Sequence, residues 1–234
     1  MGKLVDQLNM ETYNHFYGYS GEGMDHMYPN ENFVRLERWY FGGPRASYVL
    51  DHGFGTGENL IHLLRRGYKV EGAEVSEGAV RLVGRKLNEK VPHLKLNARL
   101  TLIDPEAEKL PYEDNTFDYI SSIGVLEYYP SRDAVISVLN ELYRVLRPGG
   151  KMIVSTAGPE NQFCKRGQKV DEDVYLYTGV EGQSNKAVKW QIYIFRDEAH
   201  IREIFSMFKV DEVGWYDNHY CDRWGFHFVI LARK

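Results

Sequence analysis

Apolar positions recur along the chain with two different periods, and these periods alternate from about residue 47 onward. Short apolar runs predict strands at residues 48–50, 68–74, 100–103, 117–123 and 151–156. Between the runs, apolar residues spaced three and four apart predict helices at residues 59–66, 77–90 and 134–146. A further helix is predicted at residues 197–208, followed by strands at residues 210–213 and 226–232.

This alternation predicts an α/β fold with a doubly wound, mainly parallel, seven-stranded sheet covered by helices on both faces. Only a turn-rich segment, too irregular for a crossover helix, joins the last two predicted strands. We therefore expect them to pair antiparallel, with the last strand antiparallel in the sheet. With 234 residues, of which 43% are hydrophobic, the chain has room for one such domain, which we expect over residues 46–234.

Two segments do not follow the alternation. Residues 1–45 are polar, aromatic and rich in glycine, with a helical period only at residues 31–41. We interpret residues 1–45 as an N-terminal lid segment. Residues 157–195 contain two strand-like stretches around a turn at residues 179–185. They predict an inserted hairpin that caps the substrate or forms the edge of a dimer.

Composition narrows the classes of function. A net charge of −4 provides no general attraction to nucleic acid, so a nucleic-acid partner is disfavoured. The 17 tyrosines exceed what core packing requires, because each buried hydroxyl needs a partner, and we expect some to line a pocket. Cys164 and Cys221 form no CxxC pair and no cluster with histidine, so we expect free thiols and no metal.

Targeting signals are not evident in this sequence. No apolar run approaches the roughly 18 residues of a transmembrane helix, and the first residues do not start an apolar signal segment. We therefore expect a cytoplasmic protein with no membrane partner.

A glycine-rich turn follows the first predicted strand, with the sequence DHGFGTG at residues 51–57. Glycines let the backbone approach a ligand closely, and open α/β sheets bind ligands beyond the carboxyl ends of their strands. Glu58 stands where the dinucleotide fingerprint G-x-G-x-x-G has its third glycine. The turn alone indicates a nucleotide-like ligand. A nicotinamide-dependent oxidoreductase is the competing class, for which a parallel final strand would be expected.

A carboxylate ends the second predicted strand. Glu74 is placed to accept hydrogen bonds from both hydroxyls of a ribose. The alternative interpretation is a solvated charge at a strand end. The register of Glu74 with the glycine turn favours the role in ribose binding.

Five segments resemble, in order, the motifs of class I S-adenosylmethionine-dependent methyltransferases. They are the glycine turn at residues 49–57, the acidic motif at 72–76, the adenine loop at 106–112, the fourth-strand motif at 117–128 and the RVLRPGG turn at 144–150. The resemblance implies a Rossmann-like methyltransferase fold, with S-adenosylmethionine as cofactor and S-adenosylhomocysteine as product.

The resemblance also implies roles for single residues at the methionine end of the cofactor. Asp51 would fix the glycine turn or hold the methionine amino group through water. Gly53 and Gly55 would pack against the methionine and ribose portions. Ile123 and Gly124 would contact the methionine end.

At the nucleoside end, the resemblance implies that Glu74 binds the ribose and that Val75 flanks the adenine. Glu106 would face the adenine amino group, and the backbone N–H of Ala107 would meet the adenine ring.

The glycine turn departs from the family pattern at two positions. His52 stands where leucine or isoleucine is usual, and Phe54 where cysteine or serine is common. Phe54 is acceptable as an apolar wall of the cofactor site. His52 could hydrogen-bond to an adjacent loop.

A general base is needed only if the methyl acceptor keeps a proton at neutral pH. The candidates are the eight histidines, chiefly His15, His26, His219 and His227. Glu127, Tyr128 and Tyr129, after the fourth predicted strand, are expected to complete the acceptor pocket, with Tyr128 as a further candidate catalytic residue. A lone histidine is more often a surface or structural residue. Those at positions 15 and 26 lie in the aromatic N-terminal segment, which in similar methyltransferases folds over the cofactor. The alternative for that segment is a surface arm or a dimer contact.

Two further side chains could reach the cofactor. Tyr17 could place its ring beside the sulfonium, because aromatic faces attract cations. Arg35 could reach the cofactor carboxylate or an acidic substrate, with a solvated helix charge as the alternative.

The leading hypothesis is a methyltransferase, monomeric or homodimeric, that acts on oxygen or nitrogen of a small molecule of the sugar or secondary-metabolite type. The alternatives are a methyltransferase of RNA or protein and a non-catalytic binder of S-adenosylmethionine.

Overall fold

The structure is a computed structural model that describes residues 7–18, 27–105, 107–181, 186–219 and 224–234. Seven strands form one sheet in the order β3-β2-β1-β4-β5-β10-β9. Their bounds are β1 (Tyr48–His52), β2 (Lys69–Glu74), β3 (Ala98–Leu102), β4 (Phe117–Ile123), β5 (Leu146–Ala157), β9 (Lys209–Asp217) and β10 (Phe226–Arg233). The first five strands are parallel, and β10 runs antiparallel to both of its neighbours. The predicted fold class is confirmed, and the strand order reverses between β1 and β4.

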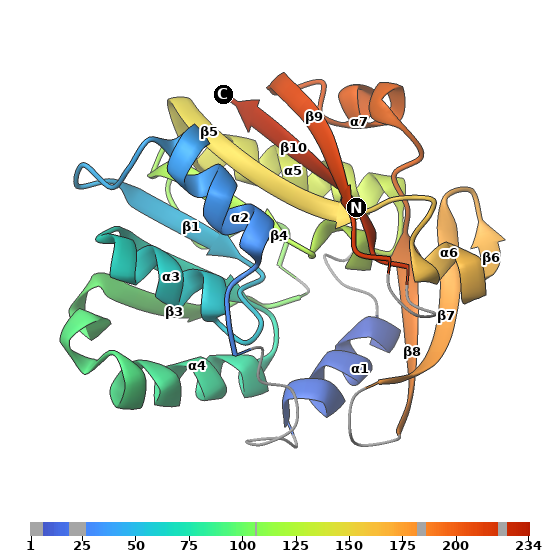
Figure 1. Ribbon diagram of the computed structural model, residues 1–234, viewed down its shortest axis with the longest axis horizontal. Coiled ribbons are helices and arrows are strands. Elements are labelled where there is room, and N and C mark those ends of the chain that lie inside the picture. Colours follow the sequence, from blue (N-terminus) through green and yellow to red (C-terminus); the bar gives the residue numbers. More distant parts are fainter. Residues whose placement is uncertain (1–6, 19–26, 106, 182–185, 220–223) are drawn as a thin grey trace.

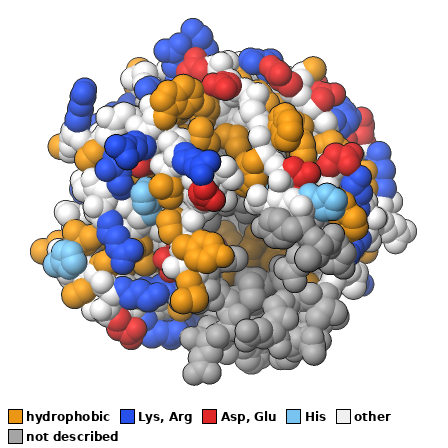
Figure 2. Space-filling model, in the orientation of Figure 1, with side chains coloured by type: hydrophobic (Ala, Val, Ile, Leu, Met, Phe, Trp, Pro, Cys, Tyr) orange, Lys and Arg blue, Asp and Glu red, His pale blue; other side chains and the backbone are white. Residues whose placement is uncertain are grey.

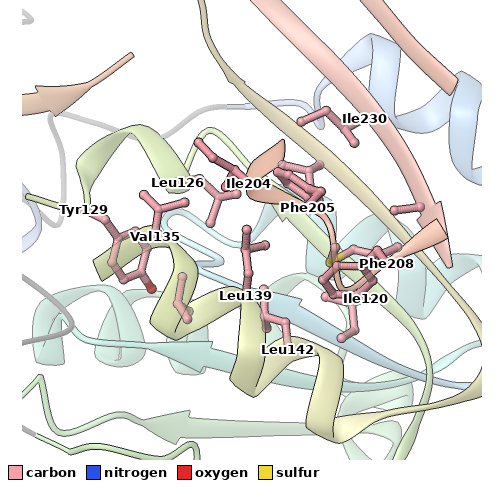
Figure 3. Packing of buried hydrophobic residues seen from close by; sticks show 14 of the residues in the cluster. Ile120, Leu126, Tyr129, Val135, Leu139, Leu142, Ile204, Phe205, Phe208 and Ile230 are labelled. Carbon is pink, nitrogen blue, oxygen red and sulfur yellow. The ribbon is translucent and has the colours of Figure 1, made fainter. Parts of the chain in front are cut away.

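Helices cover both faces of this sheet (Figure 1). The principal ones are α2 (Glu31–Leu36), α3 (Glu58–Arg66), α4 (Glu77–Lys90), α5 (Arg132–Val145) and α7 (Glu198–Ile204). Side chains alternate between the two faces along a strand, so Val49 packs with α3 and α4, whereas the adjacent Leu50 packs with α5 and α7. Figure 3 shows the hydrophobic cluster on the face of the sheet that α5 and α7 cover, in which Leu139 and Leu142 of α5 approach Ile120 of β4.

Three predicted boundaries are wrong. The helix predicted at residues 31–41 is α2 followed by a π-helical turn, η1 (Glu37–Phe41). The helix predicted at residues 197–208 ends at Ile204, because the chain turns over residues 205–208 before β9 begins. Strand β5 starts at Leu146 rather than Lys151: Phe117 pairs with Leu146 and Tyr119 with Lys151, so the Pro-Gly-Gly turn lies within β5 as an irregularity.

A second, smaller sheet is built from residues between β5 and α7. It contains β6 (Gln168–Asp171), β7 (Val174–Glu181) and β8 (Lys186–Tyr193), all antiparallel, and follows the short helix α6 (Gln162–Arg166). Strands β7 and β8 form the hairpin that the alternating pattern predicts, and β6 adds a strand to it. Trp190 and Ile192 of β8 pack with Phe163 and with Ala157 at the end of β5.

Helix α1 (Gln7–Gly18) lies against β8 and α4, beyond the carboxyl ends of the main strands (Figure 1). Asn9 is fully buried and donates from Nδ2 to the backbone oxygens of Tyr128 and Gln191, each at 2.8 Å. Its Oδ1 accepts from the backbone N–H of Gln191 at 2.9 Å. Thr12 donates to the backbone oxygen of Lys189 at 2.7 Å. Side chains of α1 therefore bind backbone groups of β8 and of η3 (Leu126–Tyr128), which sets the position of the helix.

The Asn9→Ala substitution removes three of these hydrogen bonds, each of which contributes about 1 kcal/mol. We expect amide hydrogen exchange within α1 to accelerate at least about tenfold, because the helix separates from β8 more often. Exchange in β1 should not change. The exposed residue Glu11 provides a control, Glu11→Gln. Equal protection of α1 in Asn9→Ala and the control would contradict this role of Asn9.

Candidate functional site

A cavity of about 690 Å³ lies at the carboxyl ends of β1, β2 and β4, where the strand order reverses. Its lining comes from the glycine turn, the end of β2, the segment after β4, helix α1, residues 28–32 and β8. Figure 2 shows a hollow with hydrophobic side chains near the middle of the face that it presents. The predicted site residues that line the cavity are Tyr17, Gly53, Phe54, Gly55, Glu74, Val75, Ile123, Gly124 and Tyr128.

The glycine turn leaves no room for side chains. Gly53 and Gly55 have φ angles of 69° and 51°, in the left-handed region that favours glycine. A Cβ on Gly53 would lie 2.5 Å from a methyl carbon of Val125, and a Cβ on Gly55 would lie 2.9 Å from the hydroxyl of Tyr17. The backbone of the turn therefore borders the cavity directly.

Glu74 connects the glycine turn to the end of β2. One carboxylate oxygen accepts from the backbone N–H of Gly55 at 2.9 Å, and the other accepts from Val75 and Ser76 at 2.8 and 3.1 Å. Burial raises the pKa of Glu74, and these three backbone hydrogen bonds oppose the increase. Each carboxylate oxygen has two acceptor sites, so after these three hydrogen bonds Glu74 keeps one site, on the oxygen that accepts from Gly55, for a hydroxyl group of a ligand.

Asp51 is buried beneath the same turn. Its Oδ1 accepts from the hydroxyl of Ser121 at 2.7 Å, and its Oδ2 has no hydrogen-bond partner within the described residues. Burial raises the pKa of Asp51 to about 7, against the hydrogen bond from Ser121, and the charge of Glu74 adds to the increase. Asp51 is not itself part of the cavity lining, although the neighbouring His52 and Gly53 are. An unpaired buried carboxylate oxygen at this place fits the amino group of a ligand.

His52 joins two elements beside the cavity. Its Nδ1 lies 3.0 Å from the hydroxyl of Ser122 in β4, and its Nε2 lies 3.0 Å from the hydroxyl of Tyr129. Burial lowers the pKa of His52 to about 4, so the ring is neutral at neutral pH and one nitrogen donates while the other accepts. This pair of hydrogen bonds accounts for a histidine where the family has leucine or isoleucine. Tyr129, which follows the fourth predicted strand, also lines the cavity.

Besides Asp51 and His227, three further predicted site residues lie outside the cavity lining. Arg35 is exposed and pairs with Glu31 one turn earlier, because α2 directs it to solvent. The backbone N–H of Ala107 donates to Asp104 at 3.0 Å and is therefore already bonded. His219 is exposed, and its ring stacks on a tryptophan at a centroid distance of 5.5 Å.

The remaining predicted site residues lie outside the described residues or outside the cavity lining. Glu106 and His26 lie outside the described residues, and so does the side chain of His15. His227 is described, but it lies outside the cavity lining and its Nδ1 is 2.8 Å from the backbone oxygen of Gly225.

An aromatic wall, which we define as Tyr13, Tyr128 and Trp190, completes one side of the cavity. The ring centroid of Tyr13 lies 5.5 Å from that of Tyr128 and 4.9 Å from that of Trp190. The three residues come from α1, η3 and β8, which are far apart in the sequence. Sequence reasoning selected Tyr128 alone, because no local pattern connects the three rings.

Within the described parts of the chain, no group of three or more histidine, cysteine, aspartate or glutamate side chains is placed to hold a metal ion. In the same parts, no helix is both long and apolar enough to span a membrane.

Residues 50–154 match the protein family described as "Methyltransferase domain". A sterol 4-C-methyltransferase of Caenorhabditis elegans is 31% identical over 118 residues, which are 50% of this chain and 33% of that protein. The chain spans between 33% and 50% of the length of the first curated relatives that it matches.

Two solved structures show the same fold. The PH0226 protein from Pyrococcus horikoshii superimposes with a TM-score of 0.68 at 19% identity, covering 94% of this chain and 98% of that chain. The 1,6-didemethyltoxoflavin-N1-methyltransferase of Burkholderia thailandensis superimposes with a TM-score of 0.61 at 18% identity, covering 87% of this chain and 77% of that chain. The latter structure contains 1,6-didemethyltoxoflavin and S-adenosylhomocysteine.

The buried carboxyl of Asp51 predicts a pH dependence of stability. Folding raises its pKa from about 4 to about 7, so the folded state binds more protons between these values. The free energy of unfolding should therefore fall as the pH rises from 4 to 7, by about 3–4 kcal/mol at most for this group. Denaturant unfolding at pH 5 and pH 8 measures this loss of stability. In Asp51→Asn the contribution of this carboxyl to the difference between the two pH values should be absent.

The control for this measurement is Glu212→Gln, at an exposed position of β9. It should retain the pH dependence of the unchanged protein. If Asp51→Asn loses as much stability as the control between pH 5 and pH 8, the burial of Asp51 does not have the predicted effect.

Proposed function

The chain belongs to the class I S-adenosylmethionine-dependent methyltransferases, and on this premise we propose that it transfers a methyl group to oxygen or nitrogen of a small molecule. One observation carries the proposal. The glycine turn and the Glu74 carboxylate line one cavity at the reversal point of the sheet, and the unpaired oxygen of Asp51 belongs to a buried side chain next to the lining residues His52 and Gly53.

The size of the cavity and the names of the relatives support a small acceptor. A volume of about 690 Å³ is in the range of sites that bind small molecules and cofactors. One relative is named as a sterol 4-C-methyltransferase, and one structural neighbour contains 1,6-didemethyltoxoflavin.

The residues present fit the cofactor of this family. Glu74 would accept a hydrogen bond from a ribose hydroxyl at its remaining acceptor site, and the unpaired Oδ2 of Asp51 would bind the methionine amino group. Val75 lines the cavity together with the apolar side chains Ile103 and Leu110, which would enclose the adenine ring. These assignments are proposals that rest on the burial and the unused acceptor capacity of the two carboxylates.

The cofactor supplies, when bound, a methyl group that is already activated by a sulfonium. The task of the protein is to align the acceptor with that group and to exclude water. Tyr17 places its hydroxyl next to Gly55, at the turn itself, and stacks with Tyr13 at a centroid distance of 6.1 Å. Helix α1 thereby covers the cavity with aromatic faces, which also attract a positive charge.

Calorimetry with S-adenosylhomocysteine tests whether the protein binds the cofactor at this site, on which the proposed function depends. We expect micromolar binding, and a loss of at least about 100-fold in Glu74→Ala, because both the ribose contact and the anchor of the glycine turn are removed. Glu74→Gln keeps one acceptor oxygen, so its affinity for S-adenosylhomocysteine should lie between those of the unchanged protein and Glu74→Ala. The Glu212→Gln control should bind normally, whereas no binding at millimolar ligand to the unchanged protein would refute the proposal.

A transfer assay tests the reaction itself. The protein is incubated with S-adenosylmethionine labelled in its methyl group and with fractions of a small-molecule metabolite extract. We expect label in a low-molecular-weight product, and none in the Glu74→Ala reaction. Binding of S-adenosylhomocysteine without transfer to any fraction would indicate a non-catalytic binder instead.

A further inference from the structure

A second buried carboxyl lies at the cavity, apart from the residues assigned to the cofactor. Glu127 belongs to η3, directly after β4, and only 2% of its surface is exposed. A Cβ on Gly124 would lie 3.8 Å from its Oε1, and Gly124 lines the cavity. Glu127 is not itself part of the cavity lining, but its carboxyl lies directly behind Gly124, which is.

One carboxyl oxygen of Glu127 lacks a partner. Its Oε2 is buried and has no hydrogen-bond partner within the described residues. An ionised carboxylate in such a place is unfavourable unless it binds a proton or a positively charged group. Burial raises the pKa of Glu127 to about 7, and the backbone N–H of Glu127, the hydroxyl of Thr156 and the backbone N–H of Ala157 limit the increase. Both protonation states are therefore accessible near neutral pH.

The two unpaired carboxyl oxygens at this end of the sheet indicate two positive partners. They belong to Asp51, at the end of β1, and to Glu127, after β4. The cofactor has one amino group, which the proposed function assigns to Asp51. Glu127 is left for the other molecule in the site, the methyl acceptor.

The aromatic wall lies beside Glu127. Burial raises the pKa of Tyr13 well above its usual value, and the charges of Glu74 and Glu127 add to the effects of two neighbouring tyrosines. Tyr13 is thus within electrostatic range of both carboxyls, and Tyr128 of the wall directly follows Glu127 in η3. Aromatic faces attract cations and also pack against apolar rings.

We propose that the acceptor is an amine carried on an apolar ring, whose ammonium group binds Glu127 against the aromatic wall and gives up a proton to this carboxylate. The inference rests on the proposed function and specifies its substrate class. The charged side chains that line the cavity within the described residues are the carboxylates of Glu31, Glu58 and Glu74, of which Glu31 pairs with Arg35 and Glu58 with Lys86. An ammonium group matches the sign of this lining, and a carboxylate or phosphate on the acceptor does not.

The proton transfer at Glu127 balances the reaction. One N–H proton of the ammonium passes to a carboxylate oxygen of Glu127, and its bonding pair stays on nitrogen as a lone pair. That pair forms the new nitrogen–methyl bond while the methyl–sulfur bond breaks and its electrons remain on sulfur. The product is a methylammonium ion, and the proton on Glu127 is then released to water. Glu127 in this role is a general base that touches the acceptor.

Three probes with the same phenyl ring and a two-carbon chain test the inference. They are 2-phenylethylamine, 2-phenylethanol and phenylacetate, titrated by calorimetry at pH 8 into protein saturated with S-adenosylhomocysteine. We expect the amine to bind at least about tenfold more tightly than the alcohol, and phenylacetate more weakly than both. In Glu127→Gln the affinity for the amine should fall to that of the alcohol, with S-adenosylhomocysteine binding unchanged. Glu212→Gln should keep the preference.

The pH dependence of amine binding provides a readout on the unchanged protein. Affinity for 2-phenylethylamine should rise as the pH increases through about 7, because Glu127 must ionise, and affinity for 2-phenylethanol should stay constant. The titratable groups within electrostatic range of Glu127 are Tyr13 of α1 and Tyr216 of β9. Burial raises the pKa of both tyrosines, so neither ionises in this range.

The outcomes separate the two proposals. Absence of S-adenosylhomocysteine binding refutes the proposed function. If S-adenosylhomocysteine binds normally, three results would refute the amine assignment alone. They are equal affinities for the three probes, no binding of any probe at millimolar concentration, and a preference for the amine that survives in Glu127→Gln. If Glu127→Gln does not fold, a flat pH profile of amine binding to the unchanged protein refutes it equally.

Discussion

The hydrogen bonds between the Glu74 carboxylate and the backbone N–H groups of Gly55, Val75 and Ser76 hold the site together. They connect the turn after β1 to the end of β2, two strands that are parallel neighbours with His52 opposite Ala73. This register brings the carboxylate and the turn to the same height above the sheet. The cavity, the position of Asp51 beneath the turn and the approach of α1 all depend on this connection, because each of them contacts the turn or its flanks.

Two buried carboxyls make the site a source of instability in the absence of ligands. Asp51 and Glu127 each have an oxygen without a partner within the described residues, and burial raises both pKa values to about 7. A protein maintains such groups where a ligand pairs with them, and packing elsewhere offsets their cost. The two clusters on the faces of the sheet provide that packing here. Ligand binding and stability are thereby coupled, since a ligand that binds only the folded state stabilises it.

The acceptor side of the cavity is assembled from elements that do not belong to the central sheet. Asn9 ties α1 to β8, and this contact brings Tyr13 against Trp190 and Tyr128. The small sheet and α1 thus determine what lies opposite the cofactor residues. Relatives with the same central sheet can differ in these peripheral elements, which is consistent with one fold that serves many acceptors.

The sequence by itself determined the central sheet and the cofactor side of the site, because both depend on local patterns. Apolar periods located the strands and helices, and the spacing of Gly53, Gly55 and Glu74 along two consecutive strand ends placed these residues at the cavity. The tertiary structure alone decided which residues meet from distant segments. Tyr13 joins Trp190 only because α1 binds β8, and Arg35 points to solvent because of the rotation of α2. The unpaired oxygen of Glu127 follows from burial, which depends on every element packed around it and is not encoded in any one segment.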